Sequence, residues 1–289
     1  MGETMLALTP RAGESVRDAA ELLVDHAGAE SNTCVGLARL GLRVAWISRL
    51  GADAAGDRIL RALRREGVDT QWVRRDVDRS TGLMIKDCTA GVRYYRTGSA
   101  ASILAPEDLA GVPVESARAV LVTGVTTLIG SEAQRAALSL LGASRGLRFV
   151  DPNLRTGLWG SSRRVELVLP LLDNCDVLLG GIDEMRELIG AADPGSLTRN
   201  AIARGPREVV VRAPDHVYGQ TADGESIDVE IARIPAVDPV GAGDAFNAGY
   251  IAVRLRGGSV EEAIRAGMYC GAAVTTAPSD TAAFPRTLK

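Results

Sequence analysis

Short apolar runs alternate with amphipathic stretches along most of this chain, and no other feature of the sequence constrains the fold as strongly. Five runs are apolar enough to be buried strands, at residues 44–50, 119–125, 147–151, 177–180 and 209–212. Three stretches with an apolar stripe at helical spacing and a glycine near their end lie at residues 31–40, 57–66 and 131–144. Strands that alternate with helices form parallel βαβ units, so we expect a mainly parallel sheet covered on both faces.

Two stretches break this pattern, at residues 4–9 and 82–97. The second alternates apolar with polar residues on both sides of a turn, which is typical of a half-exposed antiparallel hairpin. A small sheet beside an α/β body suggests a lid over a cleft. We therefore expect one domain over residues 1–289, with lid strands near 4–26 and 82–98 inserted in the body.

Composition excludes several classes of protein. The 33 basic and 36 acidic residues are interleaved and give a net charge of −3, which argues against a nucleic-acid partner. No apolar run reaches the roughly 18 residues that span a membrane. The cysteines are far apart and form no CxxC pair, which argues against a zinc site or a disulfide framework and fits a cytoplasmic location; they are Cys34, Cys88, Cys175 and Cys270.

The strongest chemical signal is the segment Asp-Pro-Val-Gly-Ala-Gly-Asp at residues 238–244, where a turn of small residues leads into a helix. Free amides at a helix N-terminus bind anions, and glycine lets the backbone approach a ligand closely. Asp244 then lies beside that anion, where its carboxylate can accept a proton from an attacking hydroxyl. The alternative is a glycine turn in which Asp244 stabilises the helix dipole, but the longer pattern favours a phosphate site.

Two weaker signals accompany it. Arg155 follows the strand at residues 147–151, where open α/β sheets place their ligands, and its guanidinium suits a carboxylate or a phosphate. Asn32 stands at the start of a predicted helix, where it could hold sugar hydroxyls. Each has a structural alternative: Arg155 as a surface side chain beside a turn, and Asn32 as part of an N-capping turn.

Together these segments resemble the ribokinase-like (PfkB) carbohydrate kinases. Residues 238–244 are similar to the family's C-terminal signature and residues 28–51 to its N-terminal one, and the resemblance runs from Gly2 to about Arg286. It implies a ribokinase-like three-layer α/β/α body with a mainly parallel sheet and a small β-sheet lid. It also implies an ATP-dependent kinase that acts on an alcohol group and uses Mg²⁺, with a monovalent cation left open.

Within the family, the nearest branch resembles 2-keto-3-deoxygluconate kinase. The segments that carry this are residues 2–5, 94–101 and 151–155, the last followed by Leu158 and Trp159. The implied reaction phosphorylates the terminal hydroxyl of this sugar acid, to its 6-phosphate. Guanidinium groups match carboxylate geometry, so two arginines suit an acidic substrate.

The resemblance also assigns roles to residues. Asp244 would be the catalytic base, and Glu184 would hold the metal through water. The implied anion hole is Gly241, Ala242 and Gly243. The implied substrate contacts are Gly28, Asn32, Tyr94, Arg96, Arg155 and Asp244. The implied nucleotide contacts are Arg212, Asp238, Gly241 and Gly243.

Several positions depart from the family pattern. The strand that usually precedes Gly2 is missing, and Gly181 stands where the family has an asparagine near the nucleotide phosphates. Residues 212–217 lack the two glycines of the nucleotide loop, and Pro214 leaves fewer free amides there. Met84 replaces a substrate-facing tyrosine of the branch.

These departures keep two alternatives open. One is a kinase for a neutral sugar such as fructose or ribose. The other is a catalytically impaired homologue that binds the sugar acid without turning over ATP. The exposed lid sheet also predicts a homodimer or higher homo-oligomer through the lid, with the sugar acid and ATP as small-molecule partners.

Overall fold

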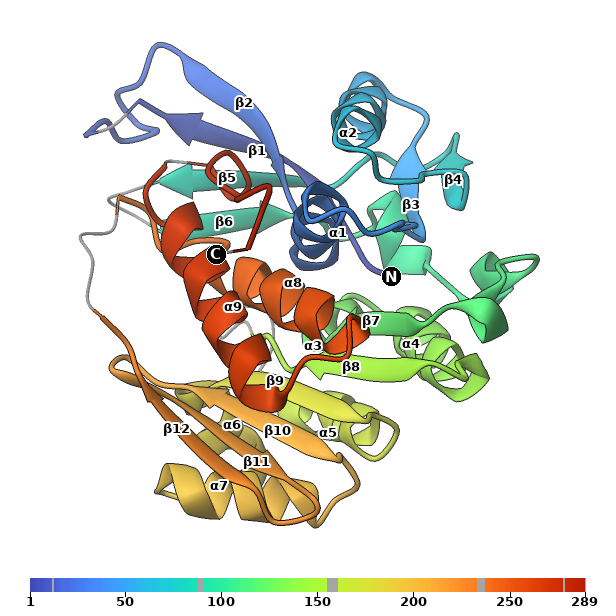
Figure 1. Cartoon of the computed structure of the whole chain (residues 1–289). Coiled ribbons are helices and arrows are strands. Elements are labelled where there is room, and N and C mark those ends of the chain that lie inside the picture. The colour runs from blue at the N-terminus through green and yellow to red at the C-terminus, as the bar shows by residue number, and fades with distance from the viewer. Residues whose placement is uncertain (12, 88–90, 155–160, 233–236, 278, 289) are drawn as a thin grey trace.

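The computed structural model describes the whole chain except residues 12, 88–90, 155–160, 233–236, 278 and 289 (Figure 1). The strands are β1 (Met5–Pro10), β2 (Leu22–Ala27), β3 (Ser48–Gly51), β4 (Val73–Asp76), β5 (Leu83–Asp87), β6 (Gly91–Tyr95), β7 (Ala119–Thr123), β8 (Leu147–Asp151), β9 (Val177–Gly181), β10 (Glu208–Arg212), β11 (His216–Thr221) and β12 (Ser226–Glu230). The α-helices are α1 (Ala29–Arg39), α2 (Ala54–Arg65), α3 (Gly124–Leu128), α4 (Ser131–Ala143), α5 (Ser161–Leu172), α6 (Ile182–Ile189), α7 (Pro194–Ile202), α8 (Ala242–Leu255) and α9 (Val260–Val274).

The main sheet has six strands in the order β12-β11-β10-β9-β8-β7. Strands β7 to β10 are parallel, and the hairpin β11–β12 extends the sheet in antiparallel pairing. Helices α4 to α7 cover one face, and α8 and α9 cover the other (Figure 1). Neighbouring residues of β9 pack on opposite faces, since Leu178 belongs to the first core cluster and Leu179 to the second. Burial on both faces explains the continuous apolar run, and the expected fold class is confirmed.

A second sheet has four strands in the order β2-β1-β5-β6 and stands beside the α/β body (Figure 1). The expected antiparallel hairpin is present as β5 and β6. Of its expected turn at residues 89–91, Gly91 is the first residue of β6, and the rest lies outside the described residues. Strand β1 joins this hairpin to β2. We call this four-stranded sheet the lid sheet. In a small apolar cluster on it, Tyr94 packs against Met5, Ala7, Ala27 and Met84.

The expected strand at residues 44–50 is wrong in extent and in partner. Only Ser48–Gly51 is a strand, and it pairs with β4 in a separate two-stranded sheet. Trp46 is fully buried against Ile59 and Leu63 of α2 in a core cluster of their own. The apolar run therefore reflected burial under a helix, which periodicity does not distinguish from burial within a sheet.

The first residues of the chain lie between the two-stranded sheet and the main sheet. The amino group of Met1 donates to the carbonyl oxygen of Leu121 in β7 at 3.0 Å, and the amide of Gly2 donates to that of Ile47 at 3.2 Å. Among the helices of the described ranges, none is long and apolar enough to cross a membrane.

Candidate active site

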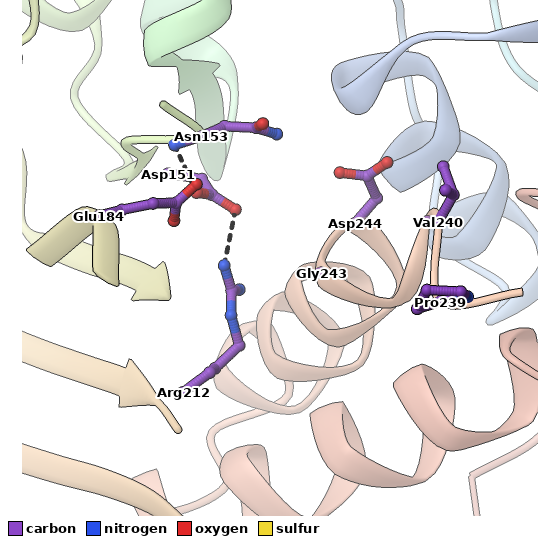
Figure 2. A pocket seen from close by; sticks show the side chains of 9 residues that line it. Asp151, Asn153, Glu184, Arg212, Pro239, Val240, Gly243 and Asp244 are labelled. Carbon is purple, nitrogen blue, oxygen red and sulfur yellow. Dashed lines mark hydrogen bonds and ion pairs between the residues drawn. The ribbon is translucent and has the colours of Figure 1, made fainter. Parts of the chain in front are cut away.

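The carboxyl ends of the parallel strands face the start of α8 across a cavity of about 320 Å³ (Figure 2). Asp151 and Arg212 are the last residues of β8 and β10, and Glu184 lies in the first turn of α6, directly after β9. This is the edge at which open α/β sheets bind their ligands. The lining residues are Asp151, Asn153, Glu184, Arg212, Pro239, Val240, Gly241, Gly243 and Asp244.

The turn that precedes α8 has a backbone that only glycine adopts easily. Gly241 has φ +86° and caps the helix, and a Cβ there would lie 2.8 Å from the carbonyl oxygen of Asp280. The amide of Ala242 donates to the carbonyl oxygen of Pro239 at 3.3 Å, while those of Gly241 and Gly243 have no acceptor within the described residues. Two amides at the start of a 14-residue helix can therefore receive an anion.

Asp244 lies one residue after these glycines, in the first turn of α8, and is only 6% exposed. Its side chain faces the cavity opposite Asp151 and Glu184 (Figure 2). Helix α1 fixes its position, because the amide nitrogen of Asn32 donates to Asp244 Oδ2 at 2.8 Å and Thr33 Oγ1 donates to the Asp244 carbonyl oxygen at 3.2 Å. A hydrogen-bonded carboxylate with this geometry can act as a general base.

Arg212 approaches the same glycines from the sheet. Its Nη1 donates to Asn247 Oδ1 at 2.7 Å, and its Nη2 lies 3.2 Å from Asp151 Oδ2 (Figure 2). Its guanidinium also lies over the ring of Phe246, 5.3 Å from the centroid. Arg212 Nη2 is 3.6 Å from the position that a Cβ on Gly243 would take. A phosphate bound at the amides of Gly241 and Gly243 would therefore also contact the Arg212 guanidinium.

Two further residues complete the sheet side of the cavity. Asp151 Oδ1 accepts the amide of Asn153 at 3.0 Å, and Asn153 adopts a positive φ of 37°. Glu184 Oε2 accepts the amide of Gly181 at 2.9 Å and so closes the N-terminus of α6. The described residues contain no group of three or more side chains arranged to hold a metal ion. A metal here would depend on ligand oxygens, as Mg²⁺ bound with nucleotide phosphates does.

Three predicted substrate residues lie on the lid side. Arg96 is 8% exposed; its guanidinium pairs with the carboxylate of Glu3 and lies 5.8 Å from the ring centroid of Tyr94. Its Nε has no partner within the described residues. Gly28 precedes α1 in an extended conformation, and a Cβ there would lie 2.4 Å from the carbonyl oxygen of Glu3. Close packing alone therefore requires glycine at this position.

The sequence prediction brought together some of these residues and missed others. Asp244, Gly241, Gly243, Arg212 and Glu184 all line one cavity. Asp238 turns back to accept the amide of Val240 at 2.9 Å and is not among the lining residues. Arg155 lies outside the described residues. Four residues were missed or given no role: Lys86, Asp151, Asn247 and Asp280. Two of these had a visible signal: Asp151 ends a strand, and Asp280 stands where the family often has a Gly-Asp pair that closes the site.

Comparison with known proteins agrees with this geometry. The profile of the pfkB family carbohydrate kinases matches residues 1–287. A 2-dehydro-3-deoxygluconokinase of Bacillus subtilis (strain 168) is 34% identical over 271 residues, covering 90% of this chain and 83% of the relative. One of Thermoproteus tenax is 30% identical over 295 residues, covering 99% and 90%.

Solved structures share the fold. A PfkB protein from Polaromonas sp. JS666 has a TM-score of 0.86 at 34% identity, with 97% of this chain and 96% of that chain covered. The 2-dehydro-3-deoxygluconokinase of Thermotoga maritima has a TM-score of 0.86 at 23% identity, covering 99% and 94%. From its site, its fold and these relatives, the chain belongs to the pfkB family of carbohydrate kinases.

Proposed function

We propose that this protein transfers the γ-phosphoryl group of ATP to the terminal hydroxyl of 2-keto-3-deoxygluconate, giving the 6-phosphate. The observation that carries the proposal is the Asp244 carboxylate, which faces a cavity beside the amides of Gly241 and Gly243 at a helix N-terminus. Relatives named 2-dehydro-3-deoxygluconokinase support the choice of substrate.

The reaction follows from this arrangement. Asp244 accepts the proton of the terminal hydroxyl of the sugar acid, and the hydroxyl oxygen bonds to the γ-phosphorus. The bond between the γ-phosphorus and the oxygen that bridges it to the β-phosphate breaks, and ADP leaves. The amides of Gly241 and Gly243, with the guanidinium of Arg212, face the negative charge on the transferred group. Catalysis of this kind comes mostly from positioning and electrostatics.

The cavity suits a Mg²⁺–nucleotide complex, because the carboxylates of Asp151 and Glu184 supply the oxygen atoms that Mg²⁺ prefers, directly or through water. When bound, Mg²⁺ would neutralise charge on the β- and γ-phosphates. Activity in K⁺ compared with Na⁺ would test whether a monovalent cation takes part.

We place the protein in the cytoplasm, consistent with its separated cysteines.

We assign the substrate carboxylate to the lid side of the site. Arg96 Nε is buried and has no partner within the described residues, so the guanidinium can still donate to a carboxylate. Glu3 already balances part of its charge, and Arg155 is the second proposed partner. A neutral sugar would leave this donor unsatisfied, which disfavours fructose and ribose.

The deciding experiment measures ADP release with Mg·ATP and 2-keto-3-deoxygluconate, beside fructose and ribose at equal concentrations. Turnover that requires the sugar acid is the expected result. Faster turnover of a neutral sugar would assign the protein to that substrate instead. Lack of turnover with every sugar, together with calorimetric binding of the sugar acid and no saturable ATP binding, would identify a binding protein that has lost catalysis.

A further inference from the structure

Lysine is almost absent from this chain. Of its 33 basic residues, 31 are arginine, and lysine occurs only at positions 86 and 289. Lys86 lies in lid strand β5, on the same side as Met84 because alternate residues of a strand share a face. Its side chain is only 12% exposed. The one lysine inside the sequence is thus largely buried, where long cationic side chains are normally in water.

The partner of Lys86 connects it to the proposed catalytic base. Its ammonium group pairs with Asp280 Oδ1. The other oxygen of Asp280, Oδ2, accepts a hydrogen bond from the side-chain Nδ2 of Asn32 at 3.2 Å. The same nitrogen also donates to Asp244 Oδ2 at 2.8 Å. Two carboxylates therefore compete for one neutral amide. Close carboxylates disfavour each other's ionised form, and Lys86 offsets the charge of one of them.

The lid sheet holds the same segment from a second strand. Ser279 Oγ donates to Asp25 Oδ2 of β2 at 2.9 Å, next to the residue that Lys86 binds. On its other side the backbone of Asp280 packs against Gly241, where even a Cβ would collide with it. Residues 279–280 are therefore held between two lid strands and the turn that presents the anion-binding amides.

We propose that Lys86 is a positioning residue that keeps Asp244 in its proton-accepting state when the lid sheet lies over the site. This inference rests on the proposed kinase function. If the lid lifts, Lys86 leaves with β5, and the Asp280 carboxylate beside Asn32 and Asp244 loses the positive charge that offsets it. Base catalysis is then coupled to lid closure, which limits turnover before the sugar is enclosed.

The role needs a positive charge that reaches one oxygen of Asp280. The ammonium of lysine supplies that charge, and the guanidinium of arginine carries the same charge. Charged groups of the described residues around the carboxylate pair include Lys86 from β5, Asp25 from β2 through Ser279, and Arg212 from β10 beside Gly243. Lys86 contacts Asp280 directly.

Kinetics of Lys86→Met, Lys86→Arg and Arg93→Met test the proposal. Arg93 is exposed on the neighbouring strand β6, so its loss removes a lid charge away from the site. Loss of a charge that supports a general base should lower kcat of Lys86→Met about 10- to 100-fold and move the acidic limb of its pH–rate profile to higher pH. The KM for ATP should change less than about threefold, since the nucleotide contacts remain.

Lys86→Arg should keep the wild-type pH profile and recover most of the lost kcat, and Arg93→Met should match the wild type in both. A Lys86→Met enzyme with kcat within about twofold of wild type and an unchanged pH profile would overturn the proposal. A uniform loss in Lys86→Met and Lys86→Arg, with no change in pH profile, would also overturn it by indicating a packing role.

Reductive methylation with ¹³C-formaldehyde gives a readout that needs no turnover. Only the two lysines and the amino terminus react, so the Lys86 resonance is resolved without further labelling. We expect Lys86 to react at least about tenfold more slowly in the folded wild type than in urea or in Asp280→Asn. Equal rates would reject the Lys86–Asp280 pair. A protected Lys86 in a wild type that fails to phosphorylate the sugar acid would reject the substrate assignment and leave the pair standing.

Discussion

At the scale of single residues, a substitution of Asp244 can distinguish proton transfer from substrate binding. In Asp244→Asn the amide keeps the size of the side chain but cannot take up the hydroxyl proton. We expect kcat to fall about 10²- to 10⁴-fold, the usual contribution of a general base, with the dissociation constant of the sugar acid changing only a few fold. Steady-state kinetics measure the change in kcat, and calorimetry measures the dissociation constant of the sugar acid. Asp183→Asn, exposed on α6, is the matched control; retained turnover in Asp244→Asn would exclude the assigned base.

The residues that could be predicted are those whose role is local in the sequence. Asp244 and Gly241 stand three residues apart in one turn, so a pattern of small residues before a helix was enough to find them. Lys86 and Asp280 are separated by 194 positions and meet only because the lid sheet and the C-terminal segment pack together. No neighbour in sequence marks Lys86 as part of a site.

At the scale of elements, the turn before α8 can be tested with a pair of glycines. Gly241 and Gly257 both have φ +86°, but a Cβ on Gly257 would meet nothing within 4 Å, whereas one on Gly241 would meet Asp280. Each Gly→Ala change should cost about 1 kcal/mol for the left-handed backbone. Only Gly241→Ala should also lower kcat, by about tenfold or more, because it displaces the anion-binding amides. Thermal unfolding and kinetics of both variants decide this, and equal activities would remove the turn from the mechanism.

Helix capping gives a second test at this scale. Asp53 caps α2 by accepting the amide of Gly56 at 2.8 Å, and it also accepts the amide and the hydroxyl of Thr81. Asp193 caps α7 through the amide of Ser196 at 2.8 Å. Replacing Asp193 by Ala should lower the free energy of unfolding only slightly, because this cap is exposed and one hydrogen bond is lost. The Asp53→Ala variant should lose about 2 kcal/mol or more, because the contact with Thr81 is lost as well.

The effect of Asp53 depends on pH with a definite sign. Burial raises the pKa of its carboxyl, but hydrogen bonds from Gly56 and Thr81 and the charge of Arg75 outweigh burial and leave it lowered. A lowered pKa in the folded state means that the stabilisation is complete above the unfolded value near 4 and disappears as the pH falls through the folded value. The difference between wild type and Asp53→Ala in urea denaturation should therefore shrink in acid. A difference that is constant from pH 7 to pH 3 would contradict the assignment.

Elements differ in how well the sequence predicts them. Strand β8 was predicted to the residue, because its apolar run is buried on both faces and ends at a polar site residue. The hairpin β11–β12 was missed, although every second residue of both strands is buried. Gly219 of β11 packs against Ile264 of α9, and a glycine inside a strand weakens the local signal. Pairing partners such as that of β3 are set by packing between distant segments, which local patterns do not encode.

At the scale of the whole molecule, the lid sheet ends in two open edges, β2 and β6. Large apolar side chains are exposed on both, with Leu23 58% and Tyr95 60% exposed. Unpaired edges and exposed apolar groups are commonly covered by a second copy of the chain. We therefore expect a homodimer through the lid sheets, with an interface above roughly 1,000 Å².

Sedimentation velocity across a range of concentrations tests this expectation. Tyr95→Glu would bury an unpaired charge in such an interface, so the dissociation constant of the dimer should rise by about tenfold or more. Val77→Glu, at an 84% exposed site outside the lid strands, should leave it unchanged. Because β5 carries Lys86 within the same sheet, a weaker dimer should also loosen the lid and speed methylation of Lys86. A wild type that is monomeric at every concentration would mean that the lid edges stay open to solvent and that closure depends on the ligand alone.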